Sequence, residues 1–295
     1  MVAVPVRDAE VPASVGRLFA EQRDALRLPF TPALFRTLAR WPSYLEHVWP
    51  QLVPAVETSG FRGSSLYLGA MAREAIDQFY EPGFDPESLT DSGVSDASIP
   101  SIVGMLEVLQ FANPQSLLLA GALAEGLEKP TVGGMGRPEP RELTELEARV
   151  RVYPWRAPEE ADLPADLRDT LEDVKTILGL PFLTDDFRAI ACWPPLLEQS
   201  WAELRELRVY KLFRQRGRAL YYYARSSAKF LAQPISVSRE RLAEIGLSGD
   251  DIHDIGEVLR MFCGILPNHI MNNAAMLLAF GVPPPQPPAP PPRRT

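Results

Sequence analysis

Apolar side chains recur at intervals of three and four residues along most of the chain, as they do on the buried face of a helix. The stripe is clear in residues 18–26 and is repeated in residues 167–178. The same periodicity predicts helices over 33–40, 62–79, 99–109, 114–127 and 185–192. Alternation typical of a strand is confined to residues 150–153. We therefore expect an all-α protein.

Two Trp-Pro pairs predict helix boundaries. Because the residue before a proline avoids the α-helical region, Trp41 and Trp193 should each end a short helix. Pro42 and Pro194 then fit the first turn of the next helix, where no backbone N–H is needed.

The chain contains an internal repeat. Residues 28–49 and 180–201 align without gaps at an offset of 152, and 11 of the 22 positions are identical. The sequence therefore predicts a tandem duplication, with about six helices per unit and a pseudo-two-fold axis between the units. We place the units at 10–128 and 162–281, joined by a linker of 129–161 rich in Gly, Pro and Glu. A Pro-rich tail over 282–295 is expected to be extended and disordered.

Composition and charge narrow the function. With 295 residues and 46% apolar side chains, the chain can bury a sizeable core. Its net charge of −8 argues against nucleic-acid binding, which needs a basic surface. Two cysteines cannot form a disulfide framework and no secretory signal is readable, so we expect a cytoplasmic protein. The most apolar stretch, 99–127, is interrupted by polar side chains and is not expected to span a membrane.

Positions at which the two repeats differ in polarity are candidates for chemistry. Asp186 in the second repeat aligns with Leu34 in the first, and Asn113 in the first aligns with Leu266 in the second. Packing alone does not require a polar side chain at a position that is apolar in the other copy. If the repeats pack face to face, Asp186 and Asn113 converge at their interface, where ligand sites are common.

Structural explanations of these residues stay open. The run 184–186 fits a helix start, with one residue as the N-cap and the others favourable to the helix dipole. Asn113-Pro114 fits an N-cap followed by proline in the first turn. His269 lies in a polar cluster with three asparagines between 268 and 273, which either lines a pocket or forms a hydrogen-bonded interface. The sequence has no G-x-S-x-G, Walker A, G-x-G-x-x-G or zinc-type cysteine pattern.

The chain resembles the group I 2-haloacid dehalogenases, an all-α family that acts on D- or on both enantiomers of 2-halocarboxylic acids. The likeness covers the repeats and the linker. It rests on the run from Asp186-Phe187 to Trp193-Pro194, on Asn113-Pro114 with the leucines at 117–119, and on Pro130 with Gly133-Gly134. The resemblance implies a homodimer that needs no cofactor or metal. It also implies that Asp186 activates a water and that Asn113 helps to position that water.

The resemblance further implies a set of substrate-binding residues: Phe30, Ala33, Thr58, Asp185 and Phe262. Several of these depart from the family pattern. Asp185 stands where a serine is expected, which places a second carboxylate beside the base. Phe30 replaces a tryptophan, Ala33 replaces an aromatic residue, and Phe262 stands where a tyrosine is expected.

Two functions are therefore compatible with the sequence. The first is hydrolysis of small 2-halocarboxylic acids, with water attacking C2 directly, inversion of configuration and no covalent intermediate. A carboxylate in an apolar pocket is a competent general base for this reaction. The second is a non-catalytic or differently specialised helical module that binds a small ligand or a partner on the same fold.

Overall fold

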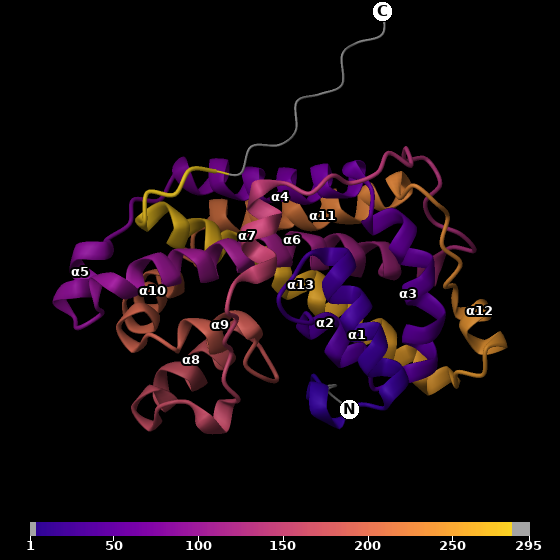
Figure 1. The fold of residues 1–295 in the computed structure, drawn as a ribbon, viewed down its shortest axis with the longest axis horizontal. Coiled ribbons are helices and arrows are strands. Elements are labelled where there is room, and N and C mark those ends of the chain that lie inside the picture. Colours follow the sequence, from indigo (N-terminus) through magenta and orange to yellow (C-terminus); the bar gives the residue numbers. More distant parts are fainter. Residues whose placement is uncertain (1–3, 285–295) are drawn as a thin grey trace, which may run out of the picture.

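Helices make up the regular structure of residues 4–284, the part of the chain that the computed structural model describes (Figure 1). Before the linker they are α1 (Ala13–Leu26), α2 (Ala33–Leu38), α3 (Pro42–Val56), α4 (Ser59–Asp77), α5 (Pro86–Asp91) and α6 (Ile99–Glu128). The linker contains α7 (Glu145–Val152). After it follow α8 (Arg168–Leu178), α9 (Asp185–Ile190), α10 (Pro194–Leu207), α11 (Lys211–Ser227), α12 (Arg239–Glu244) and α13 (Gly249–Ala279). The all-α prediction is confirmed.

The six helices before the linker and the six after it follow the same order of short and long elements. Both predicted Trp-Pro boundaries are present: α3 begins at Pro42 and α10 at Pro194, each preceded by a tryptophan with non-helical backbone angles. The repeated order agrees with the expected number of helices per unit. The duplication and the division into domains stay predictions.

The two longest helices, α6 and α13, pack against each other through the centre of the molecule. Helices α4 and α11 pack on both of them and cover them on one side (Figure 1). On the other side each short helix packs on the long helix of the other half of the chain: α2 packs on α13, and α9 packs on α6. A helix start from each half of the chain is thereby brought to the central pair.

Helix α6 corrects the prediction of two helices over 99–109 and 114–127. The helix runs without a break through Pro114, and Pro267 lies inside α13 in the same way. A proline within a helix removes one backbone hydrogen bond. Here nearly every side chain from Met105 to Leu123 is buried, so packing offsets that loss. Asn113 is therefore not an N-cap; it lies in the middle of a buried helix.

The prediction of a strand over residues 150–153 is wrong. Thr144 and Glu147 form a reciprocal capping box that starts α7, and the helix continues to Val152. In a strand, Val150 and Val152 would share a face. Instead Val150 is 2% exposed and Val152 is 78% exposed, as expected for residues just over half a helical turn apart, on opposite faces of a helix.

One helical stretch, Asp96–Glu128, is long and apolar enough to cross a membrane by length and composition. However, 83% of its most apolar window is buried inside the protein, which is typical of a core helix. Of the predicted tail, residues 285–295 lie outside the described residues.

Candidate active site

Asp186 and Asn113, which are 73 residues apart in the sequence, meet inside the protein. Asp186 is the second residue of α9, and Asn113 projects from the middle of α6. The Asn113 Nδ2 donates a hydrogen bond to Asp186 Oδ1 over 2.6 Å. Both side chains are buried and line one cavity. The expectation that they converge is therefore confirmed.

A second amide holds the same carboxylate oxygen. Asn273 on α13 donates through Nδ2 to Asp186 Oδ1 over 3.1 Å. Among the described residues, no donor forms a hydrogen bond with the other oxygen, Oδ2. Asn273 belongs to the polar cluster around His269, but nothing in the sequence pattern predicts a role for it. Two asparagines, one from each central helix, thus hold Oδ1 and leave Oδ2 without a partner among the described residues.

His269, from the same polar cluster, lies in the wall of the cavity. Its ring packs edge-on against Phe187, with 5.8 Å between ring centroids. Burial lowers the pKa of His269, and this effect outweighs the opposite influence of the nearby Asp186 carboxylate. The imidazole is therefore neutral at pH 7. Each of the two explanations of the cluster holds for one residue: His269 lines the cavity, whereas Asn273 forms a hydrogen bond between helices.

The neighbouring carboxylate, Asp185, is held by two arginines. Arg36 and Arg188 both donate to Asp185 Oδ1, the latter over 2.6 Å. The two arginines occupy equivalent positions of the predicted repeats, at the offset of 152. Burial acts to raise the pKa of Asp185, but the attraction of the two guanidinium groups holds it below its usual value. Asp185 lines the cavity with its charge neutralised, so it is not the extra free charge that the sequence suggested.

The helix start at 184–186 also differs from the N-cap explanation. Thr184 occupies the N-cap position, but its side chain makes no capping hydrogen bond and its hydroxyl oxygen is buried without a partner. Asp185 bonds to arginines and Asp186 to asparagines. Both carboxylates lie in the first turn of α9, where the helix dipole favours them, but their side-chain hydrogen bonds go to arginines and asparagines and not to the helix backbone.

The cavity brings together most of the predicted substrate-binding residues. Phe30, Ala33, Asp185 and Phe262 line it with Asp186 and Asn113. The space open to the centre of a water molecule is about 20 Å³, which is enough for one water.

Thr58 is the exception, because it does not line this cavity. It starts α4, where its hydroxyl accepts a hydrogen bond from the Phe61 N–H and donates one to the Ala55 carbonyl. It borders a separate space between α4 and the end of α11. The local capping role leaves this hydroxyl no free hydrogen for a ligand.

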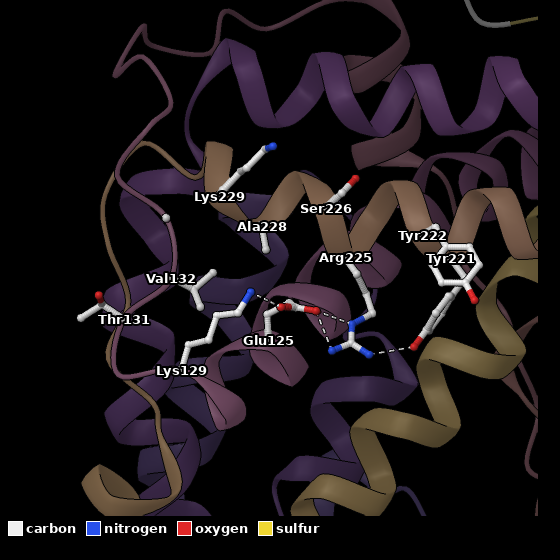
Figure 2. A pocket seen from close by; sticks show the side chains of 11 residues that line it. Glu125, Lys129, Thr131, Val132, Tyr221, Tyr222, Arg225, Ser226, Ala228 and Lys229 are labelled. Carbon is white, nitrogen blue, oxygen red and sulfur yellow. Dashed lines mark hydrogen bonds and ion pairs between the residues drawn. The ribbon is translucent and has the colours of Figure 1, made fainter.

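A larger cavity, of about 510 Å³, lies between the end of α6, α11 and the linker (Figure 2). Glu125 is its carboxylate, and Lys129 and Arg225 each approach it to 2.6 Å. These contacts hold the pKa of Glu125 below its usual value despite partial burial, which acts in the opposite direction. A carboxylate paired in this way is a poor base, so the smaller cavity is the better candidate for chemistry.

Comparison with known proteins gives a consistent result. The chain is 24% identical over 271 residues to an (R)-2-haloacid dehalogenase of Pseudomonas putida, a match that covers 91% of this chain and 89% of the relative. It is 25% identical over 273 residues to a configuration-inverting 2-haloacid dehalogenase of Alcaligenes xylosoxydans xylosoxydans, covering 86% and 85% of the two chains.

Solved structures share the fold. A D-2-haloacid dehalogenase in complex with L-LA has a TM-score of 0.87 and 22% identity, over 93% of this chain and 95% of the other. A mutant D-2-haloacid dehalogenase with D-2-CPA has the same TM-score and 21% identity, over 93% and 94%. In addition, the family model described as halocarboxylic acid dehydrogenase DehI matches residues 29–187, more than half of the chain. The chain therefore belongs to the DehI family.

Proposed function

We propose that this protein is a hydrolytic dehalogenase of small 2-halocarboxylic acids, and that Asp186 is the general base that activates water. The arrangement of Asp186 carries the proposal. One of its oxygens is held by two amides, and the other accepts no hydrogen bond within the described residues. The Asp186 side chain borders a cavity with room for a water. The related 2-haloacid dehalogenases support the substrate class.

The reaction needs only this base and a bound haloacid. Water donates a hydrogen bond to Asp186 Oδ2 and attacks C2 of the substrate while its proton passes to the carboxylate. The new C–O bond forms as the carbon–halogen bond breaks, and the halide leaves with the electron pair from the opposite side. The product is a 2-hydroxy acid of inverted configuration, and Asp186 then returns the proton to solvent.

The surroundings of Asp186 suit an anionic substrate. Because Arg36 and Arg188 neutralise Asp185, the substrate carboxylate meets one uncompensated negative charge instead of two. Ala33 and Leu34, at the start of α2, occupy the repeat positions of Asp185 and Asp186 but carry no charge. Backbone N–H groups in the first turn of a helix lack partners within it, so this side of the cavity can accept a carboxylate.

The decisive experiment is halide release from the separate enantiomers of 2-chloropropionate, with chiral analysis of the lactate formed. We expect turnover of at least one enantiomer and lactate of opposite configuration. A single turnover in oxygen-18 water, with enzyme in excess, should place the label in lactate. Label that enters the protein instead would indicate an ester intermediate. Absence of halide release from both enantiomers would favour the non-catalytic module.

The two asparagines that hold Asp186 should each contribute to kcat, and by different amounts. A hydrogen bond to a charged group contributes about 1.5–3 kcal/mol, so Asn113→Ala and Asn273→Ala should each lower kcat roughly 10- to 100-fold. The larger loss is expected at Asn113, whose bond is shorter. The measurement is kcat and KM for each variant.

Asn272 supplies the matched control, because it is buried on α13 beside Asn273 but neither of its side-chain polar atoms has a hydrogen-bond partner among residues 4–284. Asn272→Ala should keep the wild-type kcat. An equal loss of kcat in all three variants would show that the asparagines act on folding and not on the base.

A further inference from the structure

The linker between the two halves passes along the candidate cavity. Trp155, which is half-buried, stacks on Phe30 with 4.2 Å between ring centroids and 12° between ring planes. Phe30 is itself part of the cavity wall. The linker thus contacts the cavity wall directly, through the stacked rings of Trp155 and Phe30.

The segment on either side of Trp155 is fastened to both halves of the chain. Before it, the Tyr153 ring lies against α6 at Gly104, where a Cβ would come within 2.8 Å of the ring. The Tyr153 hydroxyl donates to the Ser101 carbonyl over 2.8 Å. After it, Glu159 pairs over 3.1 Å with Arg188, the residue that also holds Asp185 in the cavity wall. Residues 153–159 therefore form a strap across the junction of the halves.

The cavity is too small for the proposed substrate as it stands. Space for one water does not hold a three-carbon haloacid, so part of the wall must move when the substrate enters. Asn113, Phe262 and Asp186 belong to helices packed in the core. Phe30 and Ile265 are the half-buried residues of the wall, but Ile265 belongs to the core helix α13. Phe30 lies in the turn between α1 and α2 and is backed by the half-buried Trp155, so this stack is the part of the wall that can yield at least cost.

We propose that Trp155 is a specificity-determining residue, which limits the size of the substituent on C2 by supporting Phe30. The inference rests on the proposed function and refines its substrate class to haloacids whose C2 carries hydrogen or a methyl group. Longer 2-haloacids are excluded because their alkyl chain would have to displace the Phe30–Trp155 stack. Entry of a short substrate shifts the stack without breaking it.

The test compares kcat/KM for 2-chlorohexanoate and 2-chloropropionate in wild type and Trp155→Ala. Because each methylene that a pocket accepts or rejects changes kcat/KM by about 10- to 200-fold, the ratio of the two values should rise at least 10-fold in the variant. Trp155→Phe, which keeps a stacking ring, should behave as wild type. Val152→Ala, at an exposed position just before the strap, is the control for altered linker stability. An unchanged ratio in a folded Trp155→Ala variant would overturn the proposal.

A second measurement does not depend on turnover. Trp155 fluorescence, taken as the difference between wild type and Trp155→Phe, should become less accessible to acrylamide when propionate fills the cavity. If wild type releases no halide but propionate protects Trp155, the proposed function fails and the contact between strap and cavity stands. If propionate leaves the quenching of Trp155 unchanged, the role of Trp155 is refuted whatever the activity of the enzyme.

Discussion

Replacing Asp186 with asparagine is expected to reduce kcat for halide release at least about 100-fold, the lower bound of what a positioned general base contributes. Asparagine has nearly the same shape, and its carbonyl oxygen can still accept the hydrogen bonds of Asn113 and Asn273. Its NH₂ group, which takes the place of Oδ2, cannot accept a proton from water. The fold should therefore survive while the chemistry is lost.

Initial rates of halide release over a range of 2-chloropropionate concentrations measure this loss, and thermal melting checks the fold. Asp186→Glu is the informative companion, because it keeps a carboxylate but moves it by about one carbon–carbon bond. We expect it to retain more activity than the asparagine variant and less than wild type. More than a tenth of wild-type kcat in Asp186→Asn would exclude Asp186 as the base.

The second large effect concerns stability. Asp185→Ala should destabilise the protein by about 3–5 kcal/mol, because removing one member of a buried ion pair leaves its partners uncompensated. Arg36 would then have no carboxylate partner, and Arg188 would keep only Glu159. Denaturant unfolding of wild type and variant measures the difference in the free energy of unfolding.

A double variant separates the loss of the carboxylate from the unpaired charge that it leaves. Adding Arg36→Leu to Asp185→Ala removes the cation that is left without an ion pair and should recover part of the lost stability. Strictly additive losses would indicate that Asp185 and Arg36 do not stabilise each other. A loss below about 1 kcal/mol in Asp185→Ala alone would contradict the neutralisation of these charges by Asp185.

Asp185 also gives the fold a dependence on acid. The two guanidinium groups hold its pKa below the usual value of 3.8, against the effect of burial. Since the pKa is lower in the folded state than in the unfolded state, the ionised carboxylate stabilises the fold above about pH 4. This contribution is lost as the pH falls below that value and through the lowered folded pKa. Melting temperatures between about pH 2.5 and pH 6 should fall less steeply with acid in Asp185→Asn than in wild type.

The helical fold and the contact between Asp186 and Asn113 could be predicted because each corresponds to a pattern in the sequence. Apolar spacing reports which face of a segment is buried, and the Trp-Pro pairs limit where helices end. The two predicted repeats served as controls for each other, so a polar residue in one of them alone pointed to a role outside packing.

The errors arose where tertiary contacts override local preference. Asn113-Pro114 has the local pattern of a helix start, but burial on all sides carries α6 through it. The Arg36–Asp185 contact joins residues 149 positions apart and depends on how the halves are oriented, which no local pattern contains. Asn273 lay in a recognised polar cluster, yet its target could be named only once α13 had been placed beside α9 and α6.

The carboxylate of the candidate base and the two amides that hold it come from both sides of the linker. Asn113 comes from before the linker, whereas Asp186 and Asn273 come from after it. Neither half carries a full set, so a protein nicked within 129–161 would regain turnover only where its fragments reassemble. Activity would then serve as a reporter of fragment complementation, sensitive to errors in docking that a measurement of helix content would miss.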